Sequence, residues 1–329
     1  MIIDAHSHLV APPAFYQPWV QMAASGVHNG RIRPPVSDDE LIAAADRQIG
    51  LMDAVGTDVQ FTSPRPYVLN HSHRSGQIIH WWVENNNDAI AAQVRARPGR
   101  IQGVGALPQV AGQPVTVVFD ELDRCLDELG MIGVLVNPDP GEGDGLTPTM
   151  GDEYWYPLYE KLVDRDVPVL LHSASCHGRE NYSQHFISEE SLAIGSILEG
   201  EVFSNFPTLK LIVPHGGGSV PYQMGRWIAH KARLQGLPAA EATGAYRTEL
   251  RRFWFDTCLY TTEALELLFR AVGADRVLFG TERPGSGGIL EDLKPVIEKL
   301  DVLDEDDRAA VFEGNARSLY TRFAPPGAT

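Results

Sequence analysis

The sequence has little of what marks a secreted or membrane-spanning protein. Its 329 residues include only three cysteines, and no two of them have Cys-x-x-Cys spacing. A set so sparse and odd in number argues against a disulfide framework and favours a reducing compartment. No apolar stretch reaches the roughly 18 residues of a membrane-spanning helix, and the N-terminus shows no basic segment followed by an apolar one. We therefore expect a cytoplasmic protein with no signal peptide and no membrane contact.

Positive charge is also scarce. There are 27 lysines and arginines against 43 aspartates and glutamates, which gives a formal net charge of -16. No dense run of basic residues occurs, so a nucleic-acid-binding surface is not expected. An anionic small molecule is still a possible ligand, because a buried pocket can place a few arginines against the global charge.

Eight short, mostly apolar runs alternate with longer helical patterns along the whole chain. Continuous β-branched runs of this kind are typical of strands buried on both faces. Their alternation with helices predicts a (β/α)8 TIM barrel in one domain, residues 1–329. An open doubly wound sheet is the alternative, but it would gather polar residues at one switch point rather than after many strands. The predicted strands are Met1–Asp4, Asp58–Thr62, Ile101–Ala106, Gly133–Asn137, Pro168–His172, Leu209–Pro214, Phe253–Thr257 and Val277–Gly280.

Helices are predicted between these runs. Ser37, followed by Glu40, has the pattern of an N-cap with a capping box and opens an amphipathic stretch to Val55. The segment 10–35 is rich in Pro, Gly and aromatic residues, and we interpret it as an inserted loop that forms a lid or a subunit contact. The other predicted helices are 118–129, 154–164, 191–205, 263–272 and 290–300.

Two histidines close the first predicted strand, in Asp4-Ala-His6-Ser-His8. Side chains alternate along a strand, so His6 and His8 point to the same side. Two imidazoles at the carboxyl end of a strand supply half of a divalent metal site. Two ordinary histidines, one of them solvated, would give the same pattern.

Two further strands end in histidine. The apolar run before His172 stops abruptly at that residue, and burying an imidazole there without a partner would be costly. His215 ends another run and precedes three glycines, which allow a ligand to approach the backbone. We predict His172 as a third metal ligand, and His215 as a ligand or a general acid/base.

Glu282 follows the last predicted strand, where a carboxylate can ligate the metal or move a proton. Arg65 follows the second strand, Arg226 follows the triple glycine, and Arg283 is next to Glu282. A guanidinium binds a carboxylate through two hydrogen bonds, so these arginines are candidate substrate-binding residues.

These residues together resemble the amidohydrolase-2 family, which includes aminocarboxymuconate-semialdehyde decarboxylase and its relatives. The resemblance spans nearly the whole chain and rests on Asp-x-His-x-His, the strand-end His172, Pro214-His-Gly-Gly-Gly218 and the final acid. Within the family the chain is most similar to the 4-oxalomesaconate hydratases, which share a Glu at the position of Glu282, where the decarboxylases carry Asp. The loops 176–188 and 283–288 and the stretch after Arg65 depart from the hydratase pattern.

The resemblance implies one divalent metal, Zn²⁺ or else an ion such as Mn²⁺, held by His6, His8, His172 and Glu282. It adds Tyr222 and Asn137 as substrate-binding candidates. The implied reaction is hydration of a conjugated C=C in an unsaturated keto-polycarboxylate of aromatic acid catabolism, with Glu282 and His215 as catalytic residues. The alternatives are non-oxidative decarboxylation, a non-catalytic ligand-binding barrel, and hydrolysis of a lactone or amide. A homodimer is expected on the same grounds.

Overall fold

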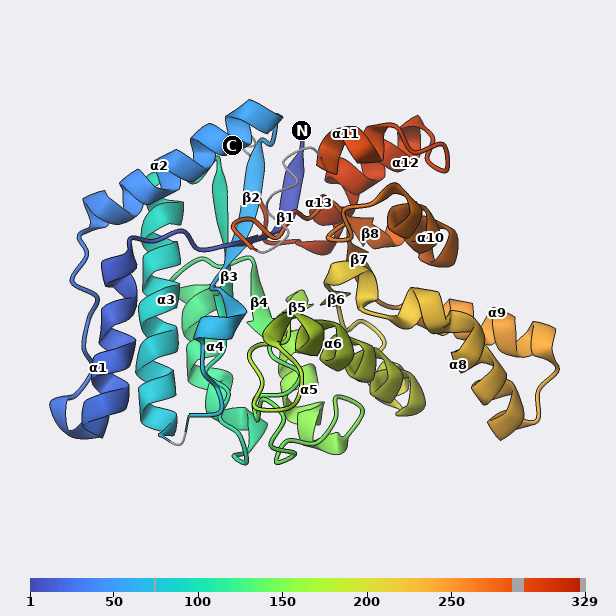
Figure 1. Ribbon diagram of the computed structural model, residues 1–329, viewed down its shortest axis with the longest axis horizontal. Coiled ribbons are helices and arrows are strands. Elements are labelled where there is room, and N and C mark those ends of the chain that lie inside the picture. The colour runs from blue at the N-terminus through green and yellow to red at the C-terminus, as the bar shows by residue number, and fades with distance from the viewer. Residues whose placement is uncertain (74, 286–292, 326–329) are drawn as a thin grey trace.

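The computed structural model describes residues 1–73, 75–285 and 293–325, and an eight-stranded parallel sheet lies at its centre (Figure 1). Each strand pairs with the next one along the chain, in the order β1 to β8. The bounds are β1 (Ile3–His8), β2 (Val59–Ser63), β3 (Ile101–Ala106), β4 (Gly133–Val136), β5 (Val169–Leu171), β6 (Leu211–Val213), β7 (Trp254–Asp256) and β8 (Val277–Leu278).

Single backbone hydrogen bonds join the two outer strands of the sheet. The amide of Ala5 donates to the carbonyl of Phe279 (2.8 Å), that of Glu282 to the carbonyl of His6 (2.7 Å), and that of His8 to the carbonyl of Arg283 (2.7 Å). The sheet therefore closes on itself, and the predicted (β/α)8 barrel is confirmed over the open sheet.

Helices surround the barrel, and the one predicted from Ser37 to Val55 is confirmed. The Ser37 hydroxyl accepts from the amide of Glu40, whose carboxylate accepts from the amide of Ser37. The bounds are α1 (Gln17–Ser25), α2 (Asp38–Val55), α3 (Gly76–Ala96), α4 (Phe119–Asp127), α5 (Tyr156–Asp164), α6 (Tyr182–Glu199), α7 (Val202–Asn205), α8 (Val220–Gln235), α9 (Ala239–Leu250), α10 (Thr262–Val272), α11 (Leu293–Glu298), α12 (Glu305–Ala309) and α13 (Asn315–Leu319).

Two helix predictions need correction. The helix expected over 191–205 begins at Tyr182, where Asn181 caps it together with Gln184, and it ends at Glu199 before the short α7. Residues 290–292 of the helix expected over 290–300 lie outside the described residues, and α11 covers Leu293–Glu298. Among the helices that the structure describes, none combines the length and the hydrophobicity needed to cross a bilayer.

Alternation along the strands divides the core into layers. Val134 and Val136 of β4 belong to a cluster with Leu158 of α5, so they pack outward against the helices. Leu135, between them, belongs to a second cluster with Leu170, Ile212 and Leu278 of other strands. The barrel interior is thus filled by side chains, and its open end is left for polar residues.

The segment 10–35, predicted as an inserted loop, contains a helix. α1 lies alongside α3 on the outside of the barrel (Figure 1). Phe15 and Met22 are buried, and the Phe15 ring centroid is 5.6 Å from that of Trp82 on α3. The residues that line the central cavity, described below, come from other parts of the chain.

Candidate active site

Three imidazoles meet at the carboxyl end of the barrel. His6 and His8 come from β1, and His172 follows β5 directly. Their ring centroids are 5.0 to 5.4 Å apart, and one ring nitrogen of each lies within 4.8 Å of the others. The structure therefore brings together the three predicted nitrogen ligands.

Asp256, at the end of β7, orients His6. Its Oδ2 accepts from Nδ1 of His6 at 2.7 Å, and its Oδ1 accepts from the amide of Cys258 at 3.1 Å. Burial by itself would raise the pKa of Asp256, but the hydrogen bond and charge of His6 lower it overall. Nε2 of His6 is buried, and no described residue bonds to it. Asp256 therefore leaves this nitrogen free to ligate a metal, which is the usual role of a carboxylate behind a ligating histidine.

His8 and His172 are also oriented by a hydrogen bond at Nδ1. Nδ1 of His8 forms a hydrogen bond with the Ser63 hydroxyl (3.0 Å), and Nδ1 of His172 donates to the carbonyl of Ser173 (2.7 Å). Burial lowers the pKa of both imidazoles, and the nearby histidines lower it further. Nε2 of His172 is also buried without a partner in the described chain. Neutral imidazoles with an inward nitrogen are the donors that a divalent transition metal requires, so these residues fit such an ion.

Glu282 and His215 lie beside the three histidines. Oε1 of Glu282 is 3.6 Å from Nε2 of His215, and both residues have the left-handed φ that is rare outside glycine (59° and 51°). Burial alone would raise the pKa of Glu282, but the hydrogen bond and charge of His215 outweigh it and hold this pKa at about 2. The Tyr260 hydroxyl donates to Oε2 at 3.1 Å. A carboxylate oxygen of Glu282 lies within 4.8 Å of a His172 nitrogen, near enough to serve as metal ligand or as base.

Glu190 of α6 is a functional candidate that the sequence analysis missed. It is fully buried, and its two oxygens accept from Nδ1 of His215 at 2.9 and 3.0 Å. Burial raises the pKa of Glu190 to about 7, although His215 opposes this shift. Burial acts to lower the pKa of His215, but the carboxylates of Glu190 and Glu282 raise it well above its usual value. The pair therefore holds a proton next to the cavity.

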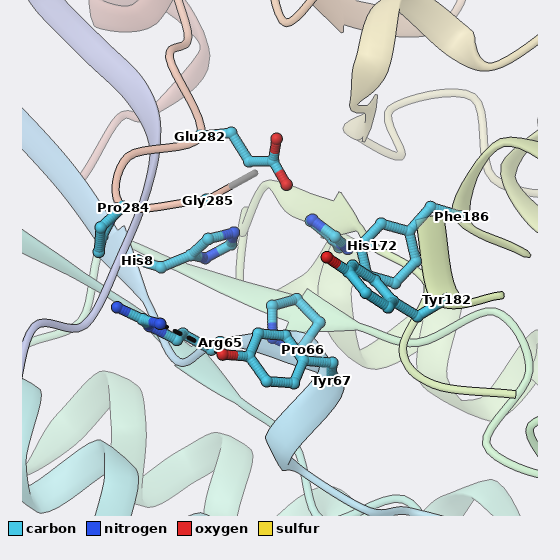
Figure 2. Close-up of a pocket in the computed structure, with 10 residues that line it drawn as sticks. All are labelled: His8, Arg65, Pro66, Tyr67, His172, Tyr182, Phe186, Glu282, Pro284 and Gly285. Carbon is cyan, nitrogen blue, oxygen red and sulfur yellow. Dashed lines mark hydrogen bonds between the residues drawn. The ribbon is translucent and has the colours of Figure 1, made fainter. Parts of the chain in front are cut away.

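The cavity in front of these groups has a volume of about 390 Å³ and contains Arg65 as its basic side chain. In Figure 2, His8 lies between Glu282 and Arg65, and the rings of Tyr67, Tyr182 and Phe186 form the wall on the other side. Nη1 of Arg65 donates to the Tyr67 hydroxyl at 3.2 Å. The lining residues are His8, Arg65, Pro66, Tyr67, His172, Tyr182, Phe186, Glu282, Pro284 and Gly285.

Two of the predicted substrate-binding residues are next to the site but not in this lining. Asn137 is fully buried, and its backbone amide and carbonyl bond to the side chain of Gln109. Arg283 lines a separate small cavity with Asp4 and Gln48. Their role in substrate binding stays a prediction.

Arg226 and Tyr222 lie on α8, which projects away from the barrel (Figure 1). Both are exposed, and Tyr222 has 52% of its surface accessible. Neither contributes to the cavity lining within the described chain. A substrate contact by these two residues therefore also stays a prediction.

The chain belongs to the amidohydrolase family, because the model of that family matches residues 3–322. It is 34% identical to a 2-keto-4-carboxy-3-hexenedioate hydratase of Sphingobium sp. over 98% of this chain and 96% of that one. It is 27% identical to a gamma-resorcylate decarboxylase of Polaromonas sp. over 87% of this chain and 90% of the other.

Among solved structures, the chain is similar to the 4-oxalomesaconate hydratase of Rhodopseudomonas palustris. The TM-score is 0.83, the identity is 29%, and the likeness covers 98% of this chain and 96% of that one. These comparisons confirm the family resemblance, and they define the chain as a lyase of a metal-dependent family.

Proposed function

We propose that the protein is a hydratase that adds water to the conjugated C=C of an unsaturated keto-polycarboxylate similar to 4-oxalomesaconate. Likeness over almost the full length to two hydratases supports this activity. The observation that carries it is a proton-holding pair, His215 and Glu190, next to an ionised Glu282 and three inward imidazoles. Addition of water to an alkene needs a base that takes a proton from the attacking water and an acid that protonates the neighbouring carbon, and this arrangement supplies both.

The metal that we propose is Zn²⁺, with Mn²⁺ as the alternative. His6, His8 and His172 would hold it, and Glu282 would be the fourth ligand or the base. When bound, such an ion supplies Lewis-acid polarisation of a substrate oxygen.

The positions of the side chains around the cavity suggest which of them binds the substrate and which of them transfer protons. Arg65 pairs with a substrate carboxylate and orients the double bond in the cavity. Glu282 takes one proton from a water molecule, and the oxygen of that water bonds to the alkene carbon farther from the keto group. His215 gives one proton to the carbon next to the keto group, and Glu190 balances the charge of its ring. One water is consumed, and no carbon leaves the substrate.

Decarboxylation is the second candidate, because the similarity to a decarboxylase also covers most of the chain. Metal-replete protein would be given 4-oxalomesaconate made in situ, and the loss of conjugated absorbance and the release of CO₂ would be followed together. We expect chelator-sensitive loss of absorbance without CO₂. Stoichiometric CO₂ would overturn the hydratase proposal in favour of a carboxy-lyase, and no change with metal bound would exclude this substrate.

We also propose that the protein forms a homodimer in the cytoplasm. The helix α8 projects from the barrel and exposes apolar side chains, including Trp227 and Leu234, of which Leu234 has 69% of its surface accessible. Exposed apolar patches of this kind mark association surfaces. Sedimentation equilibrium would give twice the chain mass, whereas the mass of one chain would contradict the proposal.

A further inference from the structure

We propose a second metal site, formed by Asp139, His185 and Glu189, that binds a divalent transition metal and fastens the loop after β4 to α6. The site is separate from the three-histidine cluster, and it does not rest on the hydratase activity. One oxygen of each carboxylate and one ring nitrogen of His185 lie within 4.8 Å of one another.

The chain presents these three ligands from two directions. His185 and Glu189 are four residues apart on α6, so they share one helix face. Asp139 reaches them from the loop after β4, and its carboxylate is held by the amides of Gly141 (3.0 Å) and Gly143 (2.6 Å). Each oxygen uses one lone pair for these bonds and keeps another for a metal. Asp139 and Glu189 are half-buried, so their side chains have room to adjust around an ion.

His185 gives an independent sign that a ligand belongs here. Only 8% of its surface is accessible, and its Nε2 is buried with no partner among the described residues. Its Nδ1 is 3.5 Å from a carboxylate oxygen of Glu180. His6 also has a carboxylate at Nδ1, that of Asp256 in a hydrogen bond of 2.7 Å, and its Nε2 is likewise without a partner among the described residues. A carboxylate behind one ring nitrogen and an unsatisfied nitrogen in front is typical of a metal-ligating histidine.

The negative charges around His185 also favour a bound cation. Asp139, Glu180 and Glu189 surround His185, and no ion pair in the described part of the chain joins any of the three to a lysine or arginine. Burial, with the like charges of Asp139 and Glu180, raises the pKa of Glu189 to about 7. A divalent ion would offset this repulsion. One imidazole and two carboxylates suit Zn²⁺ or Mn²⁺ better than Ca²⁺, which takes oxygen ligands.

A metal at this position would stabilise α6, which contributes to the candidate active site. Tyr182 and Phe186 of α6 line the central cavity, and Glu190 of the same helix bonds to His215. A metal bound at His185 and Glu189 would fix the helix that carries all three. The ion itself would lie outside the cavity lining.

The experiment counts metal. Protein stripped with chelator would be saturated with Zn²⁺, passed through a desalting column, and analysed by inductively coupled plasma mass spectrometry. We expect two equivalents per chain in the unaltered protein and one in Glu189→Gln and in His185→Asn. Glu199→Gln, an exposed carboxylate on the same helix, is the matched control and should keep two.

His8→Asn separates the two sites, because it removes a ligand of the central cluster only. It should keep the equivalent that Glu189→Gln loses, and circular dichroism would verify that each variant is folded. One equivalent in the unaltered protein, lost in His8→Asn, would overturn the proposal. Two equivalents in both Glu189→Gln and His185→Asn would overturn it too, because the second ion would then sit elsewhere. Neither result depends on any substrate, so failure of the proposed reaction would remain distinguishable.

Discussion

Two acids around the histidine cluster have different neighbours and therefore different roles. Asp256 faces Nδ1 of His6 from behind, and it also binds backbone amides. Glu282 faces the cavity, near Nε2 of His215, in a backbone conformation that costs free energy for a residue other than glycine. The first acid is placed to position a ligand, and the second is placed to meet substrate.

Replacing Glu282 by Gln tests its part in proton transfer. The amide keeps the size of the side chain but cannot take a proton, so we expect kcat to fall by about 10² to 10⁴. The three histidines remain, so the bound metal should be retained, as measured by metal analysis alongside the kinetics. Glu160→Gln, an exposed carboxylate on α5, should be unchanged. Normal turnover of Glu282→Gln would contradict the role, whereas loss of the metal would make Glu282 a ligand.

Replacing Asp256 by Asn tests a positioning residue. The amide preserves the hydrogen bond to His6 in part but removes the charge that supports it, so we expect the affinity for Zn²⁺ to weaken about 10–100-fold. Competition with a chromophoric chelator would measure this affinity. The unfolding midpoint of the metal-free protein should change little. An unchanged affinity would contradict the positioning role and leave Asp256 only its bonds to backbone amides.

Some residues of the candidate site can be predicted from the sequence, and others cannot. His6 and His8 lie in the last part of β1 and His172 directly follows β5, and a polar residue at such a place is unusual enough to be noticed. Asp256 also ends a strand, but its partner is known only when β7 and β1 lie in one barrel. Glu190 is surrounded by polar residues of α6, and only the packing of α6 on the barrel shows that it is fully buried. Arg226 is a candidate because it follows the triple glycine, and Tyr222 because of the family resemblance. Both lie on α8, which projects away from the barrel, so their contact with substrate stays a prediction.

At the scale of elements, α2 shows how far local sequence controls a helix end. Ser37→Ala removes the hydroxyl that accepts from the amide of Glu40, so we expect a loss of about 0.5–2 kcal/mol in the free energy of unfolding. Urea titration would measure this change, and kcat should stay the same, because no residue of α2 is among the described residues that line the cavity. Ser25→Ala is the control, since its hydroxyl bonds to the backbone carbonyls of Gln21 (2.8 Å) and Gly26 (3.5 Å) and caps no helix amide. Equal losses for both variants would argue against a specific capping effect.

Strands were predicted better than helix starts, for a physical reason. A strand buried on both faces needs a continuous apolar run, which is visible in any sequence. The apolar pattern ends the first strand at Asp4, four residues before its observed end at His8, because polar histidines lie within the strand. α6 begins nine residues before its predicted start, because its first turns present polar residues and rely on the Asn181 cap instead of an apolar stripe.

For the whole molecule, metal binding should be coupled to folding. Only the closed barrel brings β1 and β5 histidines within reach of one ion, so the ion binds the folded state in preference to the unfolded chain. At a free Zn²⁺ concentration of 100 times Kd, stabilisation is about 2.7 kcal/mol. Scanning calorimetry should show a lower Tm after chelation and recovery on adding Zn²⁺. His8→Asn should recover less, and equal recovery would contradict the central site.

The residues that close the barrel are also residues of the candidate active site. The backbone bonds that join the first and last strands are made by His6, His8, Glu282 and their neighbours. Domains fold as units as they leave the ribosome, beginning from the N-terminus. His6 and His8 of β1 are made long before Glu282, which follows β8, so the site forms only after β8 has been made. A nascent chain that stops short of β8 holds the three histidines without Glu282, so the complete set of candidate ligands is assembled late.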